Sequence, residues 1–278
     1  MLGMQAVGAD TAVGPAWTGM TSMIVAGMAT ALAASVVAAA SVVRRLSRGL
    51  PVVEPRPHPA ATWRGADVAV IALMYVGFAV ASGAALDTSA APRAQVAASI
   101  AVQGVAALAG IAMLRAKGAS WAALGAVGGR WRDDAWIAAG GLALVLAPLL
   151  GIAAALDRIV SYRHPLVTFL EGNRDPVAIA LVVVAAVVVA PIAEEFFFRR
   201  ALQGWLEARL PEADGGAAIG LSAAAFAAAH LGHGLAPAPL FLLGVALGFI
   251  ARRTGSLVPC ILLHAGFNAV GVALLLAS

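Results

Sequence analysis

The sequence predicts an all-α protein, a polytopic transmembrane helix bundle of about eight membrane segments. Of its 278 residues, 62% are apolar and 12% are charged, whereas a soluble domain has roughly 45–50% apolar and about 25% charged residues. The apolar residues lie in long unbroken runs, which are typical of spanning helices and not of the short alternating strands of a membrane β-barrel. The linkers between the runs contain the Pro, Gly and charged residues. These observations exclude an ordinary soluble enzyme, a disordered protein and a collagen-like fibre.

Eight apolar runs approach or exceed the ~20 residues that a spanning helix needs. They cover residues 17–43, 65–86, 95–114, 135–156, 177–198, 215–231, 239–251 and 257–277. The sixth and seventh are short, so we expect a sunken or re-entrant hairpin, which is tolerated where protein or a wet cavity surrounds it. The fifth stays apolar past Arg199 to about Leu206. We therefore expect one long fifth helix with a kink near Pro191.

The basic residues predict that both termini face outward. Alternate linkers contain 14 of the 18 Lys and Arg, and the opposite linkers and tails contain 4; the richer linkers cover residues 44–64, 115–134, 199–214 and 252–256. The positive-inside rule places the richer set in the cytoplasm. All but one of the basic residues are Arg, and with the Ala-rich runs this indicates a GC-rich bacterial genome and hence a bacterial plasma membrane. The dispersed charges predict membrane lipid as a partner and no nucleic acid, and linker residues such as Arg56 are expected to be exposed.

Several ionisable side chains lie inside apolar runs, where each costs roughly 3 kcal/mol or more on insertion scales. Glu194 and Glu195 end the run 182–193, and Arg199 follows in the same apolar segment. Glu195 and Arg199 are four residues apart and can pair on one helix face, while Glu194 is rotated from Glu195 by about 100°. This spacing favours one structural carboxylate held by Arg199 and one working carboxylate, Glu194.

Two later apolar runs each carry a pair of residues at the same helical spacing. Phe226 and His230 form one pair, and His264 and Asn268 present an imidazole and a carboxamide on one face of the last run. Each motif alone is commonly structural, but three motifs on successive runs favour a functional site. With a long fifth helix, one membrane-embedded cavity open to the cytoplasm would gather Glu194 with the two histidines and Asn268.

This set of side chains predicts hydrolysis by water. A carboxylate and an imidazole can share and activate a water molecule, and a second imidazole with an amide NH₂ can donate hydrogen bonds to a developing oxyanion. No Ser or Cys nucleophile is needed. Two histidines and a carboxylate could instead bind Zn²⁺, which would lower the pKa of its bound water; the candidate ligands are Glu194, His230 and His264. The sequence contains no HExxH motif and leaves both mechanisms open.

Three motifs, in order along the chain, resemble those of the CAAX protease and bacteriocin-processing (CPBP, or ABI) family, which includes the type II CAAX prenyl endopeptidases. They are Glu194-Glu195-Phe-Phe-Phe-Arg199, Phe226-Ala-Ala-Ala-His230 and His264-Ala-Gly-Phe-Asn268. The stretch Arg253-Thr-Gly-Ser-Leu-Val-Pro before the third motif also resembles the sequence of this family. The resemblance covers about residues 177–277. It implies a CPBP-like catalytic helical core at residues 171–278, preceded by N-terminal transmembrane helices at residues 1–170.

The resemblance implies roles for six catalytic residues and two residues of the substrate cavity. The catalytic residues are Glu194, Glu195, Arg199, His230, His264 and Asn268, and the cavity residues are Phe198 and Phe226. Glu194 would be the base that activates water, and His230 would share that water. Glu195 and Arg199 would brace the site. The third motif would form the oxyanion side.

The implied activity is that of an intramembrane endopeptidase acting on a protein or peptide that is lipidated, for example prenylated, or otherwise membrane-bound. The family is usually catalogued as metalloproteases, and a metal-free, glutamate-dependent mechanism has also been argued, so Zn²⁺ stays open as a cofactor. One alternative is a non-catalytic membrane immunity or scaffold protein on the same fold. Another is a proton-coupled carrier, in which the carboxylates and histidines form a relay; carriers of that type often show internal symmetry, and this sequence shows none.

Overall fold

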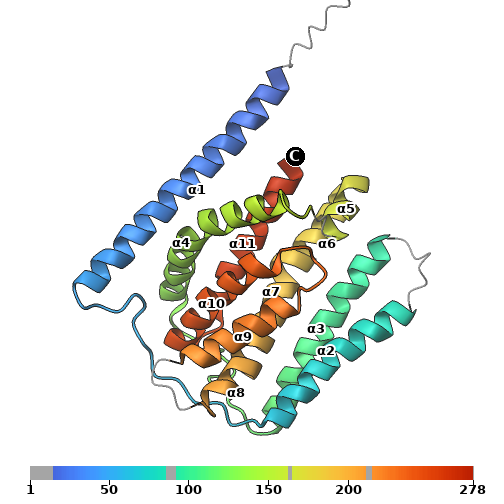
Figure 1. Cartoon of the computed structure of the whole chain (residues 1–278). Coiled ribbons are helices and arrows are strands. Elements are labelled where there is room, and N and C mark those ends of the chain that lie inside the picture. Colours follow the sequence, from blue (N-terminus) through green and yellow to red (C-terminus); the bar gives the residue numbers. More distant parts are fainter. Residues whose placement is uncertain (1–14, 86–91, 162–164, 211–214, 278) are drawn as a thin grey trace, which may run out of the picture.

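The computed structural model describes residues 15–85, 92–161, 165–210 and 215–277, and within these ranges it contains helices and no strand (Figure 1). The all-α prediction is confirmed. The helices are α1 (Pro15–Ser47), α2 (Gly65–Ala85), α3 (Pro92–Ala116), α4 (Trp131–Asp157), α5 (Pro165–Gly172), α6 (Pro176–Val183), η1 (Val184–Val189), α7 (Ala190–Glu195), η2 (Phe196–Leu202), α8 (Gln203–Glu207), α9 (Gly216–Ala228), α10 (Pro237–Thr254) and α11 (Val258–Ala277). Of these, η1 and η2 are π-helical.

Five helices in the described part of the chain are long and apolar enough to cross a membrane. They are Ala26–Ser47, Pro92–Ala116, Trp131–Asp157, Pro176–Glu207 and Val258–Ala277, and two shorter apolar helices cover Gly65–Gly77 and Gly216–Ala228. A helical membrane bundle is therefore confirmed, whereas the count of eight spans is not. At about 1.5 Å per residue, the 13 residues of α9 reach only about 20 Å, less than the ~30 Å hydrocarbon core.

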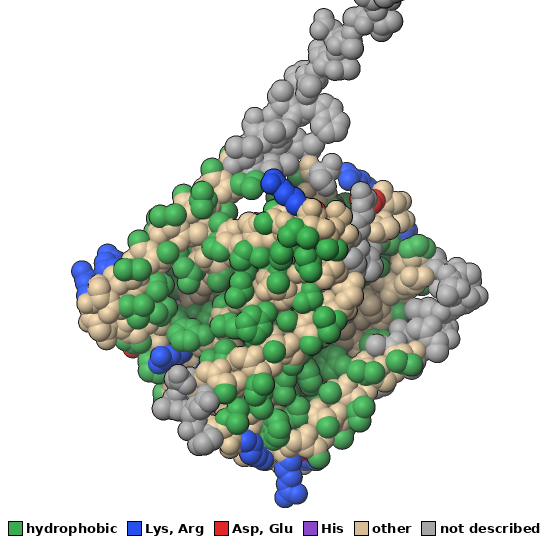
Figure 2. Space-filling view, viewed as in Figure 1, with side chains coloured by type: hydrophobic (Ala, Val, Ile, Leu, Met, Phe, Trp, Pro, Cys, Tyr) green, Lys and Arg blue, Asp and Glu red, His purple; other side chains and the backbone are tan. Residues whose placement is uncertain are grey.

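The surface of the bundle matches a lipid environment. Figure 2 shows apolar side chains spread over one face of the molecule, with Lys and Arg near its margins. Large apolar side chains are exposed on several helices, including Val36 on α1, Leu73 on α2 and Leu108 on α3. Soluble monomers rarely expose contiguous apolar patches of more than a few hundred Å². Lipid tails are the environment in which such a surface is stable.

A single long helix, built from α6, η1, α7, η2 and α8, runs through the middle of the bundle from Pro176 to Glu207. Its start is fixed locally, because the Asp175 carboxylate accepts the N–H groups of Val177 and Ala178 while Pro176 fills the first turn. It contacts α2 and α3 on one side and α9 and α11 on the other. We call it the central helix. It extends to Glu207, as the apolar run past Arg199 predicts.

Just before Pro191, where a kink is expected, the central helix contains the π-helical segment η1. In η1 each backbone hydrogen bond joins residues that are five apart, so the Ala190 N–H donates to Ala185 O. In that register the next donor would be residue 191 and its acceptor Ala186 O, but proline has no N–H. The side chain of Asn268 donates to Ala186 O instead, at 2.7 Å. A side chain of α11 thus supplies the hydrogen bond to Ala186 O that Pro191 cannot make.

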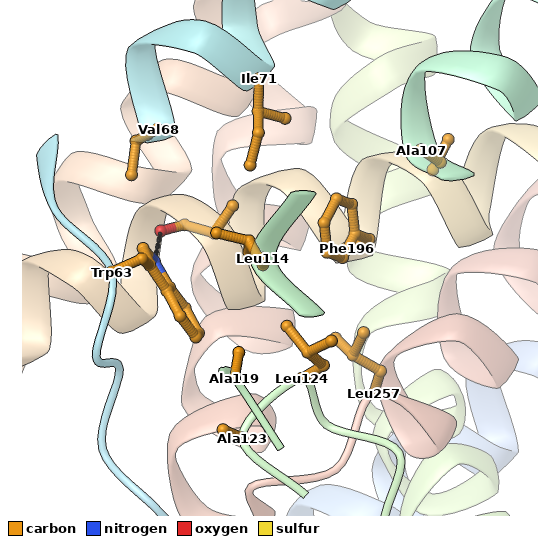
Figure 3. Close-up of a cluster of buried hydrophobic side chains, with 12 residues drawn as sticks. Trp63, Val68, Ile71, Ala107, Leu114, Ala119, Ala123, Leu124, Phe196 and Leu257 are labelled. Atoms are coloured by element: carbon orange, nitrogen blue, oxygen red, sulfur yellow. Dashed lines mark hydrogen bonds between the residues drawn. The ribbon is translucent and has the colours of Figure 1, made fainter. Parts of the chain in front are cut away.

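A buried apolar cluster joins the N-terminal helices to the central helix (Figure 3). Ile71 of α2, Leu114 of α3 and Phe196 of the central helix are each at most 2% exposed in it. Trp63, in the linker before α2, packs in the same cluster and donates its indole N–H to Ala201 O at 2.8 Å (dashed line in Figure 3). The cluster fixes the position of α2 and α3 against the helix that carries Glu194 and Glu195.

Candidate active site

The two adjacent carboxylates end α7 and lie in different surroundings. The Glu195 side chain is fully buried, whereas the Glu194 side chain is 23% exposed. This difference follows from the helix, since neighbouring residues point about 100° apart. One carboxylate therefore faces the protein interior, and the other keeps access to space outside the packed core.

Glu195 is held at both of its oxygens. Arg199 Nε donates to Oε2 at 3.0 Å, and His264 Nδ1 lies 2.9 Å from Oε1. The predicted pair between Glu195 and Arg199 therefore forms, and α11 adds a third member. All three side chains are at most 3% exposed. A buried carboxylate is tolerated when hydrogen bonds and an opposite charge satisfy it, as they do here.

Arg199 is itself fixed by α9. Its Nη1 donates to the Ser222 hydroxyl at 3.2 Å, and that hydroxyl donates to Phe198 O at 2.8 Å. The guanidinium also lies over the ring of Phe226, with Cζ 5.0 Å from the ring centroid. The buried Nη2 has no hydrogen-bond partner within the described ranges. Arg199 thereby ties η2 to α9 while it neutralises Glu195.

His264 lies between the two carboxylates. Because a carboxylate accepts, the Nδ1 atom that faces Glu195 carries a hydrogen. The opposite ring atom, Nε2, is 3.8 Å from Glu194 Oε2. This separation is too long for a hydrogen bond and close enough for strong electrostatic attraction when the ring is protonated. His264 therefore couples the buried carboxylate to the accessible one.

His230 lies in the turn that follows α9. Its Nδ1 is 2.8 Å from Phe226 O, and since a carbonyl can only accept, Nδ1 carries the hydrogen. In the neutral ring, Nε2 then has a free lone pair. The His230 ring also packs on Phe226, with ring centroids 5.0 Å apart, and Phe226 packs on His264 at 5.7 Å. One aromatic side chain thus contacts both imidazoles.

The structure places the remaining predicted residues around this group rather than at its centre. Asn268 is one turn after His264 on α11, and its amide is engaged by Ala186 O, about two turns before Glu194. Phe226 is 0% and Phe198 is 7% exposed, and their rings pack edge to face at 5.2 Å. Both phenylalanines therefore support the site from within the packed core.

The proposed zinc ligands do not form a ligand set in this arrangement. No three His, Cys, Asp or Glu side chains are grouped so as to hold a metal ion anywhere in the ranges that the structure describes. His264 Nδ1 contacts Glu195, and His230 Nδ1 contacts a backbone carbonyl, so each ring could bind a metal only through Nε2. The chemistry below is derived from the side chains alone.

Sequence reasoning missed three side chains that act on this region. Tyr75 of α2 donates its hydroxyl to Ala193 O at 2.9 Å, next to Glu194. Ser222 of α9 holds Arg199, and Trp63 holds Ala201 O. For Tyr75 a signal existed, because the sequence has only two tyrosines and this one lies in an apolar run. Ser222 and Trp63 carry no comparable signal.

The prediction that Arg56 is exposed is wrong. Its side chain is 11% exposed, and Nη1 lies 2.5 Å from Oδ1 of Asp134, which is 1% exposed. The second oxygen of Asp134 accepts the hydroxyl of Ser256 at 2.9 Å. Charge in a proline-rich linker indicated solvent, but a buried carboxylate at the start of α4 recruits this arginine. An exposed arginine suitable as a control is Arg48.

Comparison with known proteins supports the three motifs. No curated protein and no solved structure matches the chain. Residues 176–270, about a third of the chain, match the family described as type II CAAX prenyl endopeptidase Rce1-like. This range includes Glu194, Glu195, Arg199 and the two later motifs. The family is one of proteases, so its substrates are proteins or peptides. Residues 176–270, which carry all three motifs, are thus similar to the type II CAAX prenyl endopeptidase Rce1-like family.

Proposed function

We propose that this protein is an intramembrane endopeptidase that hydrolyses a peptide bond by direct attack of water, with Glu194 as the general base. One observation carries the proposal. Within the described part of the chain, Glu195 is fixed by Arg199 and His264, while its neighbour Glu194 makes no hydrogen bond and lies 3.8 Å from Nε2 of His264. An ionisable side chain inside a membrane is costly, and its default interpretation is functional.

In the proposed reaction, Glu194 takes a proton from a water molecule as the water oxygen attacks the carbonyl carbon of the substrate. The free lone pair of His230 Nε2 can accept the second hydrogen of the same water and so orient it. Attack converts the carbonyl oxygen to an oxyanion. When the tetrahedral intermediate collapses, the C–N bond breaks, and the proton held by Glu194 passes to the leaving amine. Glu194 ends the cycle as it began, as a carboxylate.

The third motif is proposed to form the oxyanion side. His264 can donate from Nε2 when that atom is protonated, and the buried ion pair of Glu195 and Arg199 keeps the ring in one orientation. Asn268 uses one amide hydrogen on Ala186 O and retains a second, because an amide NH₂ carries two. Preorganised donors of this kind contribute roughly 10²–10³ in turnover each.

The proposed substrate is a protein or peptide held in the membrane, lipidated or prenylated, in a bacterial plasma membrane with both termini of the enzyme outside. The family match supports a protein or peptide substrate. The apolar surface of the helices supports lipid as the surrounding phase. The lipid group of the substrate is inferred from the resemblance of the three motifs.

The test is proteolysis by the purified protein on a library of short prenylated and lipidated peptides. Wild type, Glu194→Ala and the surface control Glu54→Ala would be assayed with and without a zinc chelator; Glu54 has a 68% exposed side chain. We expect cleavage by wild type and the control, no cleavage by Glu194→Ala, and no effect of chelator. Cleavage that chelator abolishes would replace this mechanism with a metal-dependent one. Absence of cleavage in every arm would contradict the proposal and favour the non-catalytic immunity or scaffold protein.

A further inference from the structure

Tyr75 brings the N-terminal half of the chain to the candidate active site. It lies on α2, about a hundred residues before the range that the family match covers. Its hydroxyl donates to Ala193 O at 2.9 Å, and its ring centroid is 5.5 Å from that of Phe197. These two contacts flank Glu194 and Glu195 in sequence. No role of Glu195, Arg199 or the histidines requires this residue, so its position calls for an explanation.

The carbonyl that Tyr75 holds is attached directly to Glu194. The Cα, C and O atoms of Ala193 lie in one rigid plane with the N and Cα atoms of Glu194. A hydrogen bond on Ala193 O therefore fixes the direction in which the Glu194 side chain leaves the helix. This is a site where the helix needs such a bond, because the α-helical register ends at Glu195 and a π-helical one begins at Phe196.

The backbone around Ala193 shows the change of register. The Phe196 N–H is shared between Ala193 O and Ile192 O, whereas at the far end of η2 the Gln203 N–H donates to Phe198 O, five residues back. A shared donor satisfies a carbonyl less fully than a donor of its own. The Tyr75 hydroxyl supplies a second donor at this junction. Its position is rigid because Tyr75 packs against the same cluster as Ile71 and Phe196.

The Tyr75 ring also begins a chain of aromatic contacts that reaches the imidazoles. Tyr75 packs on Phe197, Phe197 on Phe198 at 4.9 Å, and Phe198 on Phe226 at 5.2 Å. Phe226 in turn packs on both histidines of the site. The side chain of Tyr75 thus meets the working carboxylate through the backbone and the imidazoles through packed rings.

We propose that Tyr75 is a positioning residue for Glu194, acting through the Ala193 carbonyl. The inference rests on the proposed function, because it concerns the orientation of the proposed base. Among the described residues, three other carbonyls of the central helix accept hydrogen bonds from side chains outside it, namely Ala186 from Asn268, Phe198 from Ser222 and Ala201 from Trp63. Tyr75 differs from these because it acts on the peptide group of Glu194 itself.

The first test separates positioning from general stability. Tyr75→Phe keeps the ring and removes the hydroxyl. The matched control is Ser35→Ala, which removes a buried hydroxyl that donates to Ala143 O at 2.5 Å, between α1 and α4. We expect Tyr75→Phe to lower kcat by about threefold to tenfold, the equivalent of one hydrogen bond, with KM unchanged. Ser35→Ala should leave both constants unchanged. Equal kcat in the two variants, or a change confined to KM, would overturn the proposal.

The second test needs no activity and so separates this inference from the proposed function. The single cysteine, Cys260, is buried, and Cys260→Ala gives a background without thiols. In that background, Glu194→Cys places one thiol at the position of the base, and its labelling rate with a water-soluble maleimide reports its orientation. We expect Tyr75→Phe to change this rate at least threefold and Ser35→Ala to leave it unchanged. An unchanged rate in Tyr75→Phe would refute positioning, whether or not the wild type cleaves a peptide.

Discussion

At the scale of single residues, the site depends on an asymmetry between two adjacent glutamates. Glu195 is buried and shared between a guanidinium and an imidazole, and Glu194 is partly exposed and unbonded within the described ranges. The i,i+4 spacing of Glu195 and Arg199 made their pairing predictable. The position of His264 between the two carboxylates is set by how α11 packs on α7, and sequence spacing does not contain that information.

The burial of this pair predicts the effect of removing Arg199. Arg199→Ala leaves Glu195 buried with His264 as its remaining partner, and breaking a buried pair in this way costs about 3–5 kcal/mol. We expect a large fall in the free energy of unfolding and in the yield of folded protein. The measurement is denaturant or thermal unfolding in detergent, with the exposed Arg48→Ala as the control. Equal stability of the two variants would contradict the buried network.

At the scale of elements, the central helix is held by side chains rather than by its own backbone alone. It contains two π-helical segments, η1 and η2, on either side of α7. Wider turns and Pro191 leave carbonyls without their usual donors, and such irregularity is tolerated at membrane depth only where the protein satisfies the freed groups. An irregularity of the helix near Pro191 could be predicted from sequence. Its form as a π-segment completed by Asn268 depends on a partner 82 residues away.

The compensation between Pro191 and Asn268 can be measured as a coupling. In the wild type, Asn268→Ala leaves Ala186 O without its donor and should cost about 1–3 kcal/mol of stability. In a Pro191→Ala background, the new N–H at residue 191 can bond to Ala186 O, so the same Asn268→Ala change should cost markedly less. Unfolding free energies of the two single variants and the double variant give the interaction energy. Strictly additive effects would show that the two residues do not share this carbonyl.

At the scale of the whole molecule, the linker before α2 contacts α4, α10 and the central helix, at ends that the sequence predicts to be cytoplasmic. Arg56 pairs with Asp134 of α4 and its backbone N–H bonds to Arg253 O, while Trp63 bonds to the central helix. Figure 1 shows this linker running across one end of the bundle from α1 to α2. The prolines of the linker made a loop predictable. Its anchoring was not predictable, because an isolated Arg in a loop normally faces solvent.

This anchoring predicts that Arg56 is a structural residue. Arg56→Ala leaves the buried Asp134 with Ser256 as its remaining side-chain partner, so the free energy of unfolding should fall by about 3 kcal/mol or more. Arg48→Ala, a surface change, should stay within about 0.5 kcal/mol of wild type. Unfolding of both variants in the same detergent decides the question. A wild-type midpoint for Arg56→Ala would mean that the ion pair with Asp134 contributes nothing to the fold.

Taken over the whole chain, composition and the apolar runs were sufficient for the all-α membrane bundle. They were not sufficient for the number of spans, because only five helices among the described residues are long and apolar enough to cross a membrane. Motif spacing identified the glutamates and both histidines. The resemblance assigned Phe198 and Phe226 to the substrate cavity, and in the structure both side chains are buried. Contacts made by residues far apart in sequence, Tyr75 with Ala193 above all, required the structure.

The central claim is that Glu194 is the general base and that Glu195 is a structural residue of the site. The most direct measurement compares single-turnover rates and unfolding free energies of Glu194→Gln and Glu195→Gln on a peptide that the wild type cleaves. Glu194→Gln should keep wild-type stability and lose roughly 10²–10⁴ in rate, the contribution of a general base, whereas Glu195→Gln should lose stability first, because it removes the charge that balances buried Arg199. A Glu194→Gln variant that cleaves at the wild-type rate would contradict the account.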